Sequence, residues 1–455
     1  MSEQLRSVGL DVGTTSTQLI VSMLTVENQA SSFAVPQLEI ARREILYKSP
    51  IHFTPLLDES HVDGEKLREI VEREYQNAGI TRSSVDTGAI IITGETSRKE
   101  NARRVLEALA DLAGDFVVAT AGPDLESILA AKGSGAVDYS RETGKTVLHM
   151  DIGGGTSNLA LIRDGKIVQT GCLNVGGRLL KVDGFGKVSY ISPVLQGICS
   201  LKIGDTVTRE AAEAIADRMV QALEMAAGLR QATALLQQFL TREVRDTWHC
   251  PEERTVMSFS GGVAECIDQE KSLWEFADMG PVLGKRIRAS RLCEGEYRLG
   301  TEAIRATVIG AGCHSTQLSG STVFHQNLRL PLKNLPVVEV FQPDRIRELL
   351  EKQEGPCILA LPGMASLSYR QITALAEQIC AQAGKQLLLC MEQDMAKALG
   401  QALAVRLPGE TEILCIDRVK VGEDSYLDIG TPVAQAFPVV VKTLVLNTAG
   451  KSGAH

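Results

Sequence analysis

Two stretches far apart in the chain share one pattern: an apolar run ends in an aspartate, turns through glycine and threonine, and is followed by a second apolar run. The first covers residues 8–21, with its turn after Asp11, and the second covers residues 146–162, with its turn after Asp151. Each predicts two strands joined by a tight turn. The N–H groups and hydroxyls of such a turn face a concavity that can hold an anion, and an adjacent aspartate can hold a hydrated magnesium ion. Because the pattern occurs twice, it predicts two halves that close on one nucleotide.

A third segment, residues 256–265, fits the same scheme. It predicts a buried strand, a double-glycine turn at Gly261 and Gly262, and the start of a helix near Glu265. Glycines at such a turn let the backbone approach a flat adenine or a ribose closely.

Composition excludes several classes of function. The net charge is −9 and only 4% of the 455 residues are aromatic, which argues against a nucleic-acid surface, since such a surface needs clustered cations and stacking rings. No apolar run approaches the ~20 residues that a membrane-spanning helix needs. The 10 cysteines include no C-x-x-C pair and are typical of reduced thiols in a cytoplasmic protein.

The order of predicted strands and helices indicates an α/β protein. We expect a first lobe over residues 1–144 and a second over residues 145–321. The second lobe contains a helical tract from residue 209 to 240, predicted as one core helix or a pair broken near Gly228. Residues 331–336, which begin and end with proline, predict a boundary before an extra α/β domain at 335–447.

The three motifs resemble the phosphate-1, phosphate-2 and adenosine motifs of the actin, Hsp70 and sugar-kinase ATPase superfamily. The two "connect" segments of that superfamily also have matches, at residues 93–97 and 302–312. The resemblance implies an actin-like (ribonuclease H-like) two-lobed ATPase of the α/β class, here with an additional C-terminal α/β domain, and it implies ATP and Mg²⁺ as cofactors.

The resemblance also implies roles for individual residues. Asp11 and Asp151 are the catalytic and metal-side carboxylates, and Glu95 orients the attacking water. Glu95 has an equally acceptable reading as a helix-start residue beside the positive end of the helix dipole. The residues implied to bind the cofactor are Gly13, Thr14, Thr15, Gly153, Gly154, Gly155, Thr156, Gly261, Gly262 and Glu265.

A closer resemblance, over nearly the whole chain, is to the family of ethanolamine ammonia-lyase reactivating factors (EutA). It is carried by residues 7–18, 47–56, 93–102, 151–158 and 428–432. This resemblance implies a chaperone-like ATPase that releases damaged cobalamin from adenosylcobalamin-dependent ethanolamine ammonia-lyase and lets intact cofactor enter. The lyase with its bound cobalamin is then the protein partner. The chain has no Asp-x-His-x-x-Gly motif, so we do not expect a cobalamin enzyme.

Two other functions share the superfamily fold and stay open at this point. One is a small-molecule kinase of the sugar-kinase type, and the other is an actin-like filament or scaffold protein. The sequence leaves self-association and the lyase-binding surface undetermined. The family resemblance adds the ethanolamine-utilization microcompartment to the expected cytoplasmic location, and no membrane or nucleic-acid partner is expected.

Overall fold

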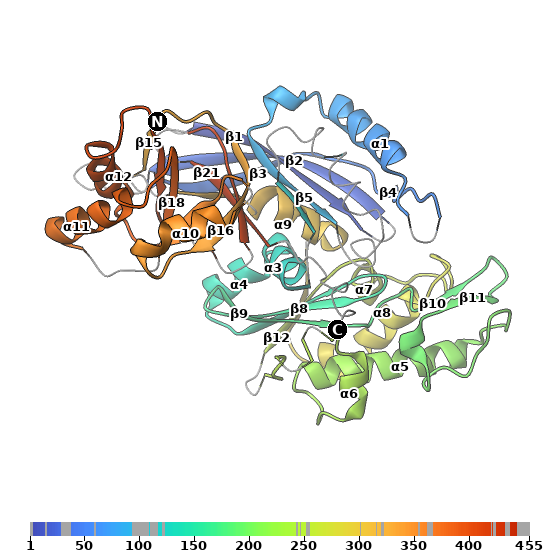
Figure 1. Ribbon diagram of the computed structural model, residues 1–455. Coiled ribbons are helices and arrows are strands. Elements are labelled where there is room, and N and C mark those ends of the chain that lie inside the picture. The colour runs from blue at the N-terminus through green and yellow to red at the C-terminus, as the bar shows by residue number, and fades with distance from the viewer. Residues whose placement is uncertain are drawn as a thin grey trace, which may run out of the picture.

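A computed structural model gives the structure of the chain. It describes residues 3–13, 16–28, 38–58, 61–92, 109, 117–120, 123–242, 244–245, 247–251, 255–300, 302–314, 316–319, 323–353, 355–361, 367–419, 421, 425–432 and 437–443. The chain forms two stacked lobes, with a third α/β unit beside the first lobe (Figure 1).

The first lobe is built on a sheet with the strand order β3-β2-β1-β5-β6, and the short β4 pairs with β2. Strands β1, β2 and β3 form an antiparallel meander, whereas β5 and β6 run parallel to β1. The bounds are β1 Glu3–Val12, β2 Ser16–Asn28, β3 Leu38–Lys48, β4 His52–Phe53, β5 Thr87–Ile92 and β6 Val117–Thr120.

The second lobe repeats this plan with the strand order β9-β8-β7-β12-β13. Strands β7, β8 and β9 again form an antiparallel meander, and β12 and β13 again run parallel to β7. The bounds are β7 Val147–Ile152, β8 Ser157–Arg163, β9 Lys166–Leu173, β12 Val256–Ser260 and β13 Tyr297–Leu299. Two sheets with this order and these directions are the ribonuclease H-like repeat, so the expected actin-like fold of two lobes is confirmed.

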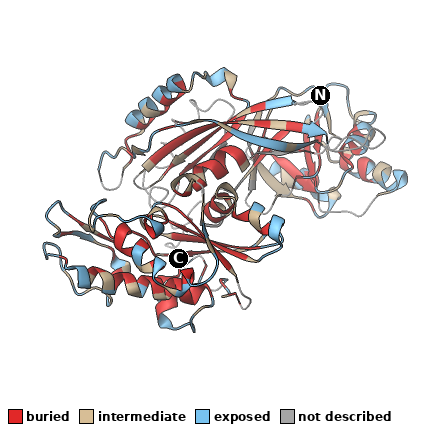
Figure 2. Cartoon of the chain, turned by 180° about the vertical axis from the view of Figure 1, so that it is seen from behind, coloured by how far each residue is buried: buried red, intermediate tan, exposed pale blue. Residues whose placement is uncertain are grey.

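Two helices cross between the lobes, α3 (Pro123–Gly133) and α9 (Ala306–His314), the latter preceded by the 3₁₀ turn η5 (Ala303–Arg305). Helix α9 lies between the two sheets, and most of it is buried (Figures 1 and 2). The helices touch at Gly310, where a Cβ atom would lie 2.1 Å from the carbonyl oxygen of Leu129. The lobes are therefore joined through a backbone-to-backbone contact with no room for a side chain.

Helices also cover the outside of the lobes. Helix α1 (Gly64–Asn77) follows the N-cap residue Asp63, whose carboxylate accepts a hydrogen bond from the backbone N–H of Lys66. Helix α4 (Ala136–Thr143) follows α3 and packs against the second sheet.

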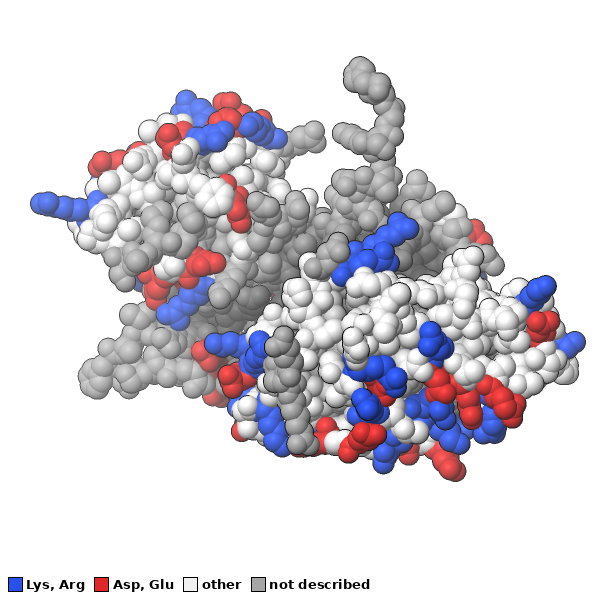
Figure 3. Space-filling view, turned by 90° about the horizontal axis from the view of Figure 1, so that it is seen from below, with Lys and Arg blue, Asp and Glu red and all other residues white. Residues whose placement is uncertain are grey.

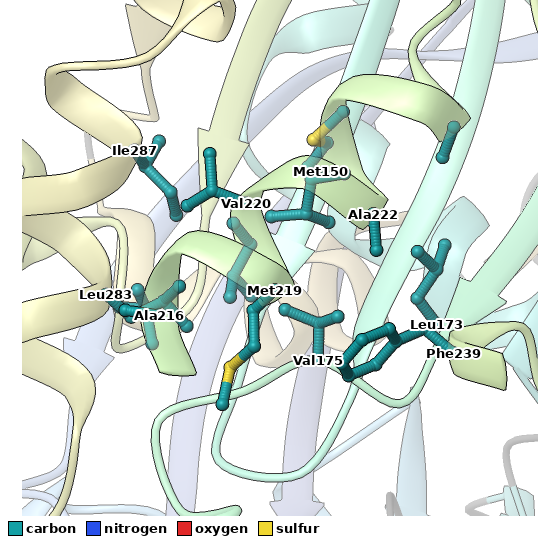
Figure 4. Packing of buried hydrophobic residues seen from close by; sticks show 14 of the residues in the cluster. Met150, Leu173, Val175, Ala216, Met219, Val220, Ala222, Phe239, Leu283 and Ile287 are labelled. Carbon is teal, nitrogen blue, oxygen red and sulfur yellow. The ribbon is translucent and has the colours of Figure 1, made fainter. Parts of the chain in front are cut away.

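The helical tract of the second lobe is a pair, as one of the two predicted alternatives had it. Helix α5 (Arg209–Ala226) ends just before Gly228, whose φ is +72°, and α6 (Ala234–Phe239) follows. Helix α5 packs its apolar face against α8 (Gly280–Arg288) and the sheet, through Met219, Leu283 and their neighbours (Figure 4). The remaining elements of the lobe are β10 (Leu180–Val182), β11 (Val188–Ile191) and α7 (Glu265–Asp268).

The C-terminal unit contains an eight-stranded sheet with the order β14-β21-β20-β16-β17-β18-β19-β15. Its strands are β14 Thr316–Leu318, β15 Phe324–Gln326, β16 Leu332–Glu339, β17 Ile358–Leu361, β18 Gln386–Met391, β19 Glu412–Ile416, β20 Ser425–Ile429 and β21 Pro438–Thr443. Its helices are α10 Ile346–Glu351, α11 Tyr369–Cys380 and α12 Ala396–Ala404. Strands β16 to β19 are parallel neighbours, so the extra α/β unit is present.

The segment at residues 331–336, where a boundary was predicted, contributes to the sheet of this unit. Strand β16 runs through Pro336 and lies between β20 and β17. The pairing with β20 has a register shift between Leu332 and Leu335, just before the proline, and the pairing with β17 begins only at Val337. Helix α12 starts at Ala396, whose N–H donates a hydrogen bond to the carboxylate of Asp417. The division of the chain at 1–144, 145–321 and 335–447 stays a prediction, although β14 and β15 precede residue 335.

Charged side chains of both signs are exposed on the surface, and the cysteines are free thiols. Figure 3 shows a face on which lysine and arginine side chains alternate with aspartate and glutamate, without a large basic field. Within the part of the chain that the structure describes, no helix is both long and apolar enough to cross a membrane. All 10 cysteines are free thiols, most of them buried.

Candidate nucleotide site

The two aspartate hairpins close in the same way. The N–H of Gly13 donates to the carbonyl of Ser16 over 2.9 Å, and the N–H of Gly153 donates to the carbonyl of Thr156 over the same distance. In the first hairpin Asp11 faces Gln18 across the strands, and in the second Asp151 faces Asn158. The predicted residues Asp11, Gly13, Gly153, Gly154, Gly155 and Thr156 are half-exposed, whereas Thr14 and Thr15 lie outside the described residues. The two halves thus present equivalent carboxylates and equivalent turns.

The carboxylate of Asp151 lies at the bottom of the second hairpin and is only 9% exposed. Its Oδ1 accepts a hydrogen bond from Ser260 over 2.5 Å, and its Oδ2 lies 3.4 Å from the hydroxyl of Thr307. Burial raises the pKa of this carboxyl group, and the two hydroxyls oppose the rise. A carboxylate in such a place gains most from a nearby cation, because little water screens the attraction.

A fully buried histidine, His149, fixes the hydroxyl that binds Asp151. One ring nitrogen lies 2.9 Å from the hydroxyl of Ser260 and the other lies 3.1 Å from that of Ser258. Burial lowers the pKa of His149 to about 3, so the ring is neutral and offers one donor and one acceptor. His149 is therefore a packed strand residue, and it orients Asp151 through Ser260.

The double-glycine turn lies against Ile152, the last residue of β7 before the turn of the second hairpin. Gly261 has φ +87°, and a Cβ atom there would lie 2.4 Å from the carbonyl oxygen of Ile152. The N–H of Val263 donates to the same carbonyl over 3.1 Å. Gly262 is exposed, and Glu265 begins helix α7 as predicted. Position 261 therefore needs glycine, both for its positive φ and for its close approach to the carbonyl of Ile152.

Residues 303–307, the start of the second connect segment, contact all three motifs. The carbonyl of Ala303 accepts a hydrogen bond from the N–H of Gly261 over 2.8 Å. The carbonyl of Ile304 accepts one from the side-chain amide of Gln18, the residue opposite Asp11, over 3.2 Å. Thr307 reaches Asp151, as described above. Three motifs that are up to 250 positions apart in the sequence thus meet around one short segment. The other connect segment, which contains Glu95, lies outside the described residues.

Sequence reasoning missed one loop, residues 176–178, which follows β9 and packs on the second hairpin. The N–H of Gly177 donates to the carbonyl of Gly153 over 3.1 Å, and the N–H of Arg178 donates to that of Gly154 over 2.6 Å. The paired glycines at 176 and 177 after a strand were the available signal, because they mark a close backbone approach.

The donor set fits a hydrated magnesium ion and phosphate oxygens. Carboxylate oxygens are the protein ligands that Mg²⁺ prefers, and the ion usually keeps several waters. Gln18 and Asn158, which face the two aspartates, each have a buried side-chain oxygen that receives no hydrogen bond from the described residues. Such an oxygen is suited to accept a hydrogen bond from a bound water. One such acceptor stands opposite each carboxylate.

Two ribonuclease H-like lobes, each with an aspartate hairpin and joined by a common connect segment, define a protein of the actin-like fold. The family model described as "Ethanolamine utilisation protein EutA" matches residues 3–447. The chain therefore belongs to the EutA family.

Curated relatives agree over their full length. The chain is 38% identical over 474 aligned positions to the ethanolamine ammonia-lyase reactivase EutA of Salmonella typhimurium, covering 97% of this chain and 99% of that protein. The identity and the coverage are the same for the protein of that name from Escherichia coli.

Solved structures are more distant. A Ppx/GppA family member from Aquifex aeolicus is 14% identical with a TM-score of 0.42, covering 68% of this chain and 97% of that one. The ethanolamine utilization protein EutJ from Carboxydothermus hydrogenoformans is 16% identical with a TM-score of 0.34, covering 67% and 88%. The assignment of the fold rests on the strand order rather than on these likenesses.

Proposed function

We propose that this chain is a chaperone-like ATPase that reactivates adenosylcobalamin-dependent ethanolamine ammonia-lyase by releasing damaged cobalamin and admitting intact cofactor. Membership of the EutA family and the names of the full-length relatives support the choice of partner. The ATPase part of the proposal rests on one observation: both aspartate hairpins and the glycine turn contact residues 303–307.

In this proposal Asp11 and Asp151 hold a magnesium ion through its coordinated water, and the N–H groups of the two hairpins receive phosphate oxygens. Bound Mg-ATP supplies the phosphoryl group that passes to water. Such a transfer needs positioning and neutralised charge more than covalent help. Glu95 remains our candidate for orienting the water, and Gly261, Gly262 and the start of α7 remain candidates for contact with adenosine.

Reactivation requires that the ATP and ADP states differ in affinity for the lyase, because hydrolysis otherwise performs no work on the partner. The lobes can differ between these states, since both contribute a hairpin to the same nucleotide. A cytoplasmic location is part of the proposal and agrees with the free cysteines. Association with the ethanolamine-utilization microcompartment and self-association stay predictions.

The test follows ATP hydrolysis and cobalamin release together, with purified chain and lyase loaded with cyanocobalamin. We expect release that needs ATP and Mg²⁺. We expect Asp11→Asn and Asp151→Asn to lower hydrolysis by at least about 100-fold, since each removes a carboxylate that holds the magnesium ion, and the ion neutralises the charge of the reacting phosphate. Asp164→Asn is the matched control. Asp164 lies in the β8–β9 turn with φ +49°, which asparagine tolerates, and it should change nothing.

Other outcomes assign other functions. Hydrolysis without cobalamin release would leave an ATPase and remove the lyase as partner. ADP formation that depends on a small hydroxylated compound would indicate a kinase, and nucleotide-dependent pelleting would indicate a filament. A chain that binds no nucleotide would end the whole proposal.

A further inference from the structure

Arg178 is a basic side chain that lies directly against the second hairpin. Its N–H donates to the carbonyl of Gly154, and its side chain runs across that glycine, because a Cβ atom on Gly154 would lie 3.1 Å from Cδ of Arg178. Gly176, two residues earlier, is equally close to the hairpin, since a Cβ atom there would lie 2.4 Å from the carbonyl oxygen of Gly154. The backbone thus fixes where this arginine begins.

One end of the guanidinium is held by the protein. Its Nε donates to Oδ2 of Asp278 over 3.2 Å, and Oδ1 of Asp278 accepts the N–H of Gly280 over 2.8 Å. The Asp278 side chain is 7% exposed and that of Arg178 is 28% exposed. Burial raises the pKa of Asp278, and Arg178 opposes that rise. The pair therefore orients the arginine from behind, on its buried side.

The other end of the guanidinium is available. Among the described residues, neither terminal nitrogen of Arg178 makes a hydrogen bond, so their four N–H donors are available to a ligand. A planar guanidinium with two terminal NH₂ groups matches the geometry of phosphate oxygens and binds them bidentately.

The position along the hairpin decides which part of a nucleotide Arg178 would meet. The glycine turn, our candidate for contact with adenosine, touches the hairpin at Ile152, the last residue of β7 before the turn. Arg178 touches the turn itself, through Gly154. A triphosphate that extends from the glycine turn across the end of β7 toward the tip of the hairpin brings its terminal phosphate nearest to Arg178.

We propose that Arg178 binds the terminal phosphate of ATP and thereby distinguishes ATP from ADP at this site. The inference rests on the proposed nucleotide-binding function and adds to it the residue that reads the γ-phosphate. Asp278 is a positioning residue in this scheme.

The same contacts connect the arginine to the rest of the lobe. The turn that carries Asp278 accepts a hydrogen bond from Val182 in β10, through the carbonyl of Ala277, and it leads directly into α8. A change in the Arg178–Asp278 pair on loss of the terminal phosphate is thus passed to two elements at once.

The test measures equilibrium binding of AMPPNP and of ADP by isothermal titration calorimetry in the presence of Mg²⁺. Arg178→Lys keeps the charge beside Asp278 but removes the forked donor. We expect it to weaken AMPPNP by about 10-fold or more and to change ADP less than about threefold, as for the loss of a charge-assisted bidentate contact. Lys187→Met is the matched control. Lys187 carries the same charge in the same lobe, directly before β11, and is exposed to solvent. It should leave both affinities unchanged.

A second variant guards against a folding defect. Removal of the arginine alone leaves a buried carboxylate without its cation, so Arg178→Met is combined with Asp278→Asn. The double variant should show the same selective loss of AMPPNP. Equal weakening of both nucleotides, or weakening of neither, would overturn the inference while leaving nucleotide binding in place. Failure of the unmodified chain to bind either nucleotide would overturn the proposed function as well.

Discussion

The crossing of α3 and α9 gives a prediction in which two effects oppose each other. Gly310 lies inside α9, where replacement of glycine by alanine ordinarily stabilises a helix by up to about 1 kcal/mol. At this place, however, the added methyl carbon would lie 2.1 Å from the carbonyl oxygen of Leu129 and 2.6 Å from its carbonyl carbon. Both neighbours are backbone atoms of the facing helix, and no side chain can rotate away to make room.

The packing effect should win. The methyl group is more than about 1 Å short of an ordinary contact distance, so the helices must separate along a close-packed interface. Overpacking of this kind typically costs about 1–3 kcal/mol, which exceeds the gain in helix propensity. We therefore expect Gly310→Ala to be destabilising by at least about 1 kcal/mol, which lowers the melting temperature by about 2–4 °C in a lobe of this size.

The assay is thermal unfolding of the full chain followed by circular dichroism. Gly409→Ala is the control, since a Cβ atom at Gly409 meets nothing within 4 Å and its backbone angle is open to alanine. That variant should melt within about 1 °C of the unmodified chain. If Gly310→Ala melts at or above the unmodified chain, the close contact between the helices is refuted.

Two further predictions concern buried polar groups. Ser260→Ala should lower the free energy of unfolding by about 1–3 kcal/mol and reduce ATP hydrolysis, because it leaves Asp151 and His149 without their shared hydroxyl; an exposed Ser83→Ala variant should do neither. The second prediction concerns pH. Burial lowers the pKa of His314 from 6.5 to about 4, so the folded state resists protonation. The stability from the neutral ring is complete above pH 6.5 and is lost as the pH falls toward 4, by up to about 3 kcal/mol. His314→Gln should therefore flatten the fall in melting temperature between pH 7.5 and pH 5, whereas substitution of the exposed His249 should not. An unchanged slope in His314→Gln would contradict the assignment.

Much of the candidate nucleotide site could be predicted from the sequence because its signals are local. A hairpin that turns through Asp, Gly and Thr is specified by a dozen consecutive residues, and both hairpins formed where the pattern predicted them. The double-glycine turn is also specified locally, because it depends on one residue, Gly261, that can adopt a φ of +87°.

The missed features depend on contacts between distant segments. Arg178 gains its place from Gly154 and Asp278, and nothing in the residues next to it indicates either neighbour. Residues 331–336 were read as a boundary because they begin and end with proline. Strand β16 nevertheless runs through them, because β17 and β20, which lie far from them in the sequence, supply its neighbours in the sheet. Residue types predict hairpins and caps, whereas the partners across the fold decide these two positions.

Helix α9 and strand β14 are separated by a single residue along the chain, since one ends at His314 and the other begins at Thr316. One residue spans at most about 3.6 Å, so this connection has almost no slack. Strand β14 in turn pairs with β21, at the edge of the C-terminal sheet. A shift of α9 by more than a few ångströms cannot be absorbed between them and must pull on that edge. This short connection therefore couples the connect segment in α9 mechanically to the additional C-terminal domain.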